Sequence, residues 1–163
     1  TLLEGDRIFV ERLSRFYSSP ERGDIMVFYP PFEEIKTDAL SIFSRLTGFF
    51  CKDIAYIKRV VGMPGDKLEI KKDSGGEYHV FINDKALDEP YILSDTDYIP
   101  CSGEMYCGPM KIPAGHYFMM GDNRGNSQDS RFWGLLPKER MIGRAVVLFW
   151  PLNRLDYFER PSY

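Results

Sequence analysis

The chain has few metal-binding side chains and no excess of basic residues. It contains two histidines and three cysteines in 163 residues, and they do not follow the Cys/His spacing of a zinc site. The net charge is −3 and the isoelectric point is near 5.5, whereas a nucleic-acid-binding protein normally carries a basic patch. We therefore expect no metal, no cofactor and no nucleic-acid partner.

Long apolar runs are also missing. No stretch approaches the ~18 apolar residues that a membrane-spanning helix needs, and no secretory leader is visible. The chain begins at Thr1 rather than at a methionine. We therefore expect it to be part of a longer gene product, whose upstream residues could include a membrane anchor.

The residues that are present favour a mostly β protein. Hydrophobic residues make up 44% of the chain and aromatic residues 15%, which is enough for a packed core. The 14 glycines and 11 prolines are spread along the chain as turn signals. Gly-Asp pairs at 5–6, 23–24 and 65–66 each precede an apolar, β-branched or aromatic run, the pattern of a turn followed by a strand.

One segment changes period. Residues 37–50 place apolar side chains at helical spacing, with Thr37 as a candidate N-cap. A helix packed on the sheet is favoured over a membrane-surface helix, because its polar face lacks basic residues. The other predicted elements are a hairpin of Lys67–Lys71 and Tyr78–Ile82, a strand at Tyr117–Met120, a helical turn at 136–140 and a buried final strand at Met141–Trp150.

The stretch Tyr56–Asp66, Y-I-K-R-V-V-G-M-P-G-D, places two cations inside a predicted strand. Lys58 and Arg59 point to opposite faces, and both faces are partly apolar. One of the two is therefore expected to lie against protein, where burial favours the neutral form of a lysine. A neutral lysine can act as a general base toward a hydroxyl. The alternative is an edge-strand lysine that prevents aggregation.

A second stretch, Gly121–Gly134, reads G-D-N-R-G-N-S-Q-D-S-R-F-W-G and is densely polar. Its side chains must form networks or remain in water. Asp129 and Arg131 would lie on one side of an extended segment and could pair, and Ser127 could bond a lysine amine. A solvated loop with an Asx-turn is the alternative, and no phosphate-binding glycine pattern is present.

The three cysteines differ in context. Cys101 and Cys107 lie in a Gly/Pro-rich loop, and their spacing could close a small disulfide loop in an oxidising compartment. Cys51 lies among apolar residues and is expected to be a buried thiol.

The two stretches together resemble type I signal peptidases, the membrane-bound Ser/Lys endopeptidases that cut leader peptides from exported proteins. R-G-D-I-M-V-F at 22–28 and I-G-R-A-V-V-L-F-W at 142–150 agree, in the family's order. The segment 30–53 looks like an insertion of cyanobacterial and plastid-type members. The Cys101/Cys107 pair is similar to a short-loop disulfide of some bacterial members.

The resemblance implies a reaction and roles. Lys58 would be the general base and Ser127 would orient its amine by a hydrogen bond. Tyr56 and Ile57 would help line pockets for small substrate side chains. The substrate, a preprotein signal peptide of the Ala-x-Ala type, would bind as an added strand. No metal or cofactor is implied.

The resemblance also implies a polar frame and a fold. Asp129 with Arg131, and Asp122 with Arg59, would surround the site. The fold would be a coiled, barrel-like antiparallel β-domain over 1–163, with a short helical insertion and a hairpin-rich second lobe over 67–113. Its location would be the bacterial plasma membrane or the thylakoid membrane, with the catalytic domain on the periplasmic or lumenal side.

One departure from the family pattern matters. The nucleophilic serine should lie four residues before Thr1 and is not in this sequence, so the chain as it stands is expected to be inactive. Two alternatives remain open: a non-catalytic peptide-binding relative and a Ser/Lys self-cleaving repressor-type domain. The aromatic residues Phe149, Trp150, Tyr157 and Phe158 could contact a membrane, although packing is slightly favoured.

Overall fold

The computed structural model describes residues 2–3, 5–13, 17–33, 54–92 and 105–161. The helix predicted at 37–50, Cys51 and Cys101 lie outside these residues. The described chain is mostly β and antiparallel, which confirms the predicted fold class. Its elements are β1 (Arg7–Glu11), β2 (Ile25–Phe28), β3 (Tyr56–Gly62), β4 (Lys67–Lys72), β5 (Tyr78–Ile82), β6 (Lys85–Ala86), β7 (Met110–Lys111), β8 (His116–Met120), α3 (Ser130–Trp133), β9 (Leu136–Pro137), η1 (Lys138–Arg140), β10 (Met141–Trp150), η2 (Leu152–Arg154) and β11 (Asp156–Tyr157).

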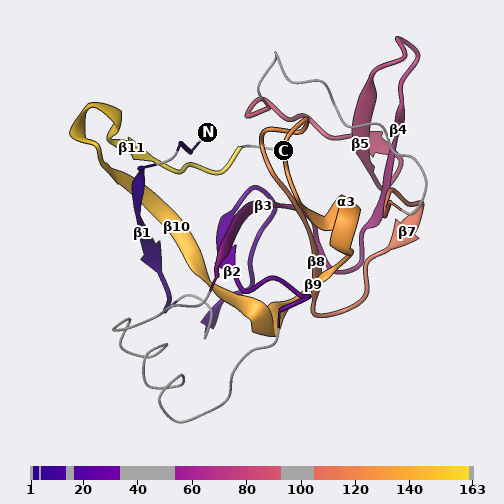
Figure 1. Cartoon of the computed structure of the whole chain (residues 1–163). Coiled ribbons are helices and arrows are strands. Elements are labelled where there is room, and N and C mark those ends of the chain that lie inside the picture. Colours follow the sequence, from indigo (N-terminus) through magenta and orange to yellow (C-terminus); the bar gives the residue numbers. More distant parts are fainter. Residues whose placement is uncertain (1, 4, 14–16, 34–53, 93–104, 162–163) are drawn as a thin grey trace.

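The larger sheet carries the site. Its strand order is β1-β10-β2-β3-β8-β9, and β11 pairs with β10 outside this path. The long strand β10 crosses the molecule in Figure 1 and has three partners. It pairs with β1 near its end, with β2 near its start, and with β11 at Val147 and Leu148. The first described strand, β1, and the last, β11, therefore flank β10 on its two edges.

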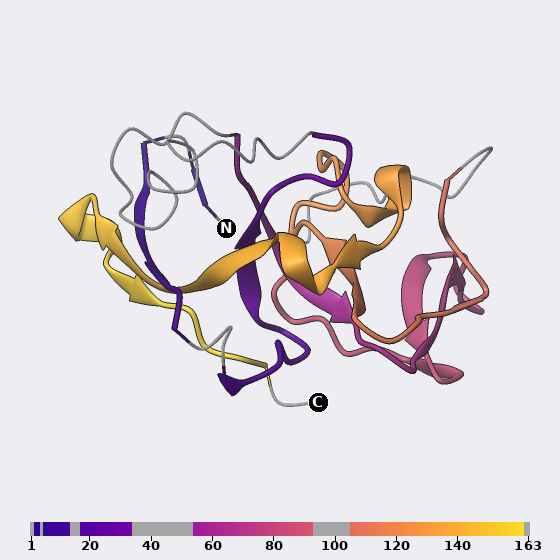
Figure 2. The ribbon, with the colours of Figure 1, turned by 90° about the horizontal axis from the view of Figure 1, so that it is seen from below.

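The smaller sheet has the order β6-β5-β4-β7 and stands beyond β8 in both views (Figures 1 and 2). Its centre is the predicted β4–β5 hairpin, which is paired from Leu68↔Ile82 to Lys72↔Tyr78. Asn83 and Asp84 form the next turn, with φ angles of 51° and 67°, a left-handed conformation that these two residue types tolerate best after glycine.

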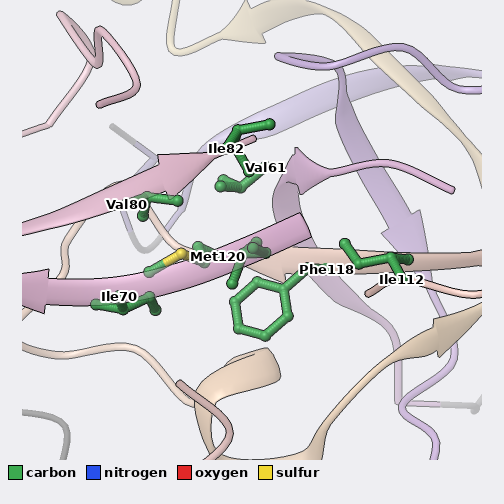
Figure 3. Packing of buried hydrophobic residues seen from close by; sticks show 8 residues of the cluster. Val61, Ile70, Val80, Ile82, Ile112, Phe118 and Met120 are labelled. Carbon is green, nitrogen blue, oxygen red and sulfur yellow. The ribbon is translucent and has the colours of Figure 1, made fainter. Parts of the chain in front are cut away.

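Strand β3 separates two apolar clusters because its side chains alternate between faces. Val61 belongs to a cluster with Leu68, Ile70, Val80, Ile82, Ile112, Phe118 and Met120, most of which Figure 3 shows. Val60 belongs to the other cluster, with Met26, Phe28, Tyr117, Met119, Leu136 and Met141. Gly62 ends the strand where a Cβ atom would stand 2.4 Å from Ile112 Cδ1, so only glycine fits there without a shift. Both faces of the strand that carries Lys58 and Arg59 are thus anchored in core.

The prediction that the final strand is buried is wrong at its end. Leu148 is buried, but Phe149 and Trp150 are 44% and 48% exposed. Tyr157 is also exposed, so the slightly favoured packing of these aromatic residues is wrong for three of the four. The reason is that, among the described strands, this end of β10 pairs with β1 and β11 alone, which form a narrow ribbon.

The segment 136–140 also differs from the prediction, since only Lys138–Arg140 is helical, as a single 3₁₀ turn after β9. Among the described residues, no helix has the length and hydrophobicity to cross a membrane.

Candidate active site

Lys58 lies in the middle of the sheet, on β3 between β2 and β8. Its side chain is half-buried, and Met26 is its partner in register on β2. Burial lowers the pKa of the Lys58 amine below its ordinary value of 10.5; Asp129 and Asp122 oppose this effect and Arg131 adds to it. The expectation of a desolvated cation in this strand is therefore confirmed, and the amine is easier to deprotonate than that of a surface lysine.

Ser127 lies beside this amine. A Cβ atom added to Gly121 would stand 2.2 Å from Ser127 Oγ and 3.6 Å from Lys58 Nζ, so the hydroxyl and the amine approach the same point. Ser127 is buried, and its Oγ makes no hydrogen bond with any described residue. The predicted hydrogen bond to Lys58 is therefore not formed in this structure. A buried hydroxyl without a partner costs roughly 1–3 kcal/mol, which favours an arrangement that brings the two groups together.

Arg59 and Asp122 form a bidentate ion pair at the edge of the site. Arg59 Nε and Nη2 donate to the two carboxylate oxygens of Asp122 at 2.8 and 2.7 Å. Arg59 Nη1 donates to the carbonyl of Gly23 at 2.8 Å, and the Tyr91 ring lies 4.0 Å from the guanidinium carbon. Arg59 is buried and its hydrogen bonds hold β3 to the neighbouring segments, whereas Lys58 is half-buried and its amine faces the cleft.

Asp129 and Arg131 form a second ion pair, which is fully buried. Arg131 Nε and Nη2 each donate to an Asp129 oxygen at 2.8 Å. The predicted pair forms, but not across an extended segment: Asp129 is the N-cap of α3, and its carboxylate also accepts from the amides of Arg131 and Gly121. Ser130 Oγ accepts from the amide of Met119 at 2.8 Å. These bonds fix the loop that carries Ser127 against β8.

A third buried pair was missed at the sequence level. Arg124, fully buried, donates from Nη1 to Glu89 at 3.0 Å and from Nε to the carbonyl of Gly121 at 3.1 Å. Glu89 lies in the irregular segment after β6, where no motif marks it. Its partner is 35 residues away in sequence, so only the fold brings the two together.

These groups surround a cleft of about 410 Å³. Ile57 lines it, as predicted, whereas the Tyr56 ring packs against Phe28 and Phe32. Asp129 and Arg131 lie behind the wall rather than in it. The lining residues are Leu2, Ile25, Ile57, Lys58, Arg59, Tyr91, Gly121, Asp122, Asn123, Asn126, Ser127, Asp156, Tyr157, Phe158 and Glu159. No motif in the sequence indicated that Tyr91 and residues 156–159 would line this cleft.

The remaining predicted site residues are the cysteines. Cys107 is disulfide-bonded, while Cys101 lies outside the described residues, so their pairing stays a prediction. Within the described part of the chain, no three His, Cys, Asp or Glu side chains gather in a way that could hold a metal ion. The cleft itself presents the Lys58 amine, the Ser127 hydroxyl and the Arg59–Asp122 ion pair.

Comparison with known proteins identifies the family to which the chain belongs. The model of the family "Signal peptidase, peptidase S26" matches residues 1–150. The chain belongs to this family. It is 43% identical over 164 residues to a signal peptidase I of Leptolyngbya laminosa, covering 100% of this chain and 70% of the relative. It is 39% identical to a probable signal peptidase I-2 of Synechocystis, covering 95% of this chain and 60% of the relative.

Other relatives extend the comparison to plastids and to solved structures. The chain is 35% identical to thylakoidal processing peptidase 1 of Arabidopsis thaliana, covering 96% of this chain and 40% of the relative. A crystal structure of a signal peptidase I from Enterococcus faecalis V583 matches with a TM-score of 0.53 and 25% identity, covering 78% of this chain and 97% of that one. The predicted resemblance to cyanobacterial and plastid-type signal peptidases is confirmed. Relatives of this family are signal-peptide-processing serine endopeptidases, so the chain falls in that class.

Proposed function

We propose that the protein removes signal peptides from exported preproteins through a Ser/Lys dyad in which Lys58 is the general base. The observation that supports this most directly is the placement of the Lys58 amine, whose pKa is lowered by burial, beside the buried hydroxyl of Ser127 in a cleft. The nucleophile is the serine expected four residues before Thr1. We propose that the activity requires this serine, so the tests below use protein that includes it.

The chemistry is acyl transfer. Neutral Lys58 takes the proton of the serine hydroxyl as the serine oxygen attacks the carbonyl carbon of the scissile bond. The resulting ammonium then gives its proton to the leaving amine, which frees the mature protein and leaves an acyl-enzyme. Lys58 next deprotonates a water molecule that hydrolyses the ester and releases the signal peptide. A lysine can serve both steps because burial lowers its pKa and so favours the neutral amine that each step requires.

The neighbouring residues act on Lys58 rather than on the substrate. We assign Ser127 to orienting the amine, because its buried hydroxyl lies near Lys58 and has no hydrogen-bond partner among the described residues. The Asp129–Arg131 pair fixes the loop of Ser127, and the Asp122–Arg59 pair fixes β3. Asp129 and Asp122 raise the pKa of Lys58 and Arg131 lowers it, but desolvation by burial is the largest effect and the net shift is downward.

We propose that the substrate binds as an extended strand in this cleft, with Ile57 at a pocket for small side chains. In that binding mode backbone hydrogen bonds supply affinity and alternate side chains supply specificity. The apolar surface of Ile57 next to Lys58 supports a preference for alanine-sized residues before the cut.

We further propose that the domain works at a membrane surface, on its periplasmic or lumenal side, and that its exposed apolar residues contact the bilayer. Phe149, Trp150, Leu152, Leu155 and Tyr157 are each more than 40% exposed and follow one another through β10, η2 and β11. Aromatic residues of this kind favour the interfacial region of a bilayer. Replacing Phe149 and Trp150 with serine should reduce sedimentation with lipid vesicles; unchanged sedimentation would contradict the contact.

The test of the peptidase function is cleavage of a preprotein by the full-length protein and its Lys58→Ala variant. We expect the variant to lose cleavage while its circular dichroism spectrum stays unchanged. The matched control is Lys67→Ala, which removes an exposed lysine that pairs with Asp84 outside the cleft and should retain cleavage. Full activity of the Lys58 variant would refute the role of that residue as the base.

A further experiment decides between an enzyme and a non-catalytic relative. Intact mass and N-terminal sequencing of the natural protein should show a serine four residues before Thr1. A natural protein that lacks it, and binds but does not cleave signal peptides, would favour the peptide-binding alternative.

A further inference from the structure

One wall of the cleft lies outside the part of the chain that the family model matches. That match ends at residue 150, yet residues 156–159 line the same cleft as Lys58. Figures 1 and 2 show this segment running from β11 back toward the strands that carry the site. The wall is therefore a feature of this chain that the family pattern does not specify.

The wall is held at both of its ends. At one end Tyr157 pairs with Val147 of β10, and the amide of Phe158 donates to the carbonyl of Val146 at 3.0 Å. At the other end Arg160 donates to both carboxylate oxygens of Asp24, from Nε at 2.5 Å and from Nη2 at 3.1 Å. A segment fixed at two points keeps its side chains in place without a core of its own.

The Arg160–Asp24 ion pair, called the latch below, is hydrogen-bonded directly to β3, the strand that carries Lys58. Asp24 is buried in the turn before β2, and its carbonyl accepts from the amide of Val60 at 2.8 Å. The preceding carbonyl, of Gly23, accepts from Arg59. The same turn thus holds β3, which carries Lys58, and the C-terminal wall, so the two sides of the cleft share one support.

The wall is acidic, and no cation within the described residues pairs with it. Asp156 and Glu159 are exposed, and neither forms an ion pair with any described residue. Across the cleft the charges of Arg59 and Asp122 cancel each other, and Lys58 must be neutral to act as a base. The cleft therefore presents two negative charges to a peptide that occupies it.

We propose that residues 156–159, latched by Arg160 to Asp24, form a charge-selective wall of the substrate cleft that favours a lysine or arginine of the preprotein and disfavours an acidic side chain. This inference rests on the proposed function, because it assumes that a peptide occupies the cleft. It assigns a role in specificity to residues that follow the part of the chain matched by the family model. Because the two carboxylates are solvent-exposed, we expect each charge to change the specificity by at most about fivefold.

The test uses the full-length protein and peptides that carry lysine, glutamine or glutamate at one position at a time near the cut, with the small residues before the cut kept. For each peptide we would measure kcat/KM for cleavage and, by fluorescence anisotropy, the affinity for a Lys58→Ala variant. We expect at least one position at which lysine is preferred over glutamate. The Asp156→Asn/Glu159→Gln variant, which removes both charges, should reduce that preference by up to about 25-fold.

Two controls separate charge at the wall from other effects. The Glu77→Gln/Asp88→Asn variant removes two exposed carboxylates that do not line the cleft, and it should keep the preference. Added salt should weaken the preference in the unmodified protein, because exposed charges are screened. The Arg160→Ala variant should lose part of the preference, since the wall loses one of its two attachments.

The outcomes distinguish this inference from the proposed function. If the neutral peptide is cleaved but no position depends on Asp156 and Glu159, the charge-selective wall is refuted and the peptidase function stands. If no peptide is cleaved, the peptidase function fails, and the binding affinities still decide the wall. A preference that survives in the Asp156→Asn/Glu159→Gln variant, or that disappears equally in the control variant, overturns the inference.

Discussion

The sharpest prediction concerns Gly121, which has no side chain at the point where Ser127 and Lys58 meet. In Gly121→Ala the new Cβ atom would lie 2.2 Å from Ser127 Oγ and 2.7 Å from Ser127 Cβ. Rotation of the Ser127 side chain relieves the first contact but not the second, because Cβ does not move with χ1. The loop must therefore shift, at a cost of typically 1–3 kcal/mol for an overpacked site.

The expected result has two parts. Urea unfolding should show a loss of about 1–3 kcal/mol in the free energy of unfolding, and cleavage by the full-length protein should fall because Ser127 is displaced from Lys58. Gly75→Ala is a suitable control: it lies in the exposed turn between β4 and β5, and its nearest neighbour is the flexible Asp73 carboxylate at 3.2 Å. That variant should be close to neutral in both assays.

A double variant tests the cause. Gly121→Ala combined with Ser127→Gly removes the atoms that clash, so most of the lost stability should return although cleavage stays low. The two substitutions should then show a coupling energy of about 1–3 kcal/mol. If Gly121→Ala is as stable and as active as the unmodified protein, the inferred contact between the loop and the amine is incorrect.

Three further predictions concern Lys58, the Arg124–Glu89 pair and the two close cysteines. Lys58→Met should raise the free energy of unfolding by about 0.5–2 kcal/mol near pH 7. Since the pKa of Lys58 is lowered in the folded state, this gain should shrink as the pH rises toward 10.5, where the unfolded lysine also loses its proton; a gain that is constant over this range would refute the desolvation. Arg124→Met should cost about 3–5 kcal/mol because it leaves the Glu89 charge buried and unpaired, and adding Glu89→Leu should recover part of this loss; equal stabilities of the single and double variants would contradict it. Cys101 and Cys107 should resist alkylation in protein made under oxidising conditions and react after reduction, whereas two reactive thiols before reduction would disprove their pairing.

Most strands could be predicted from local sequence because their signals are local. The β4–β5 hairpin, the turn at Asn83 and Asp84 and the start of β10 all follow from alternation and turn residues. The failure at Phe149 and Trp150 has a physical cause. Their apolar character predicts burial, but burial depends on what covers the end of β10, which among the described strands pairs with the narrow ribbon of β1 and β11 alone.

The candidate site was predictable where its residues lie in a motif and not where the fold alone assembles it. The placement of Lys58 in an apolar strand indicates desolvation, and the spacing of Asp129 and Arg131 indicates a pair, although not the helix cap that the pair forms. By contrast, Glu89 and the segment 156–159 reach the site through contacts that are distant in sequence. No periodicity or spacing rule predicts such contacts from a single sequence.

The position of β10 between β1 and β2 also has a consequence for biosynthesis. The pairing of Arg7 with Trp150 joins two residues at nearly opposite ends of the described chain, and contacts of such high sequence separation form late and slowly. Until β10 has left the ribosome, β1 has no partner in the larger sheet, and β2 has only β3. We therefore expect the larger sheet, and with it the cleft, to be completed only after β10 has emerged from the ribosome.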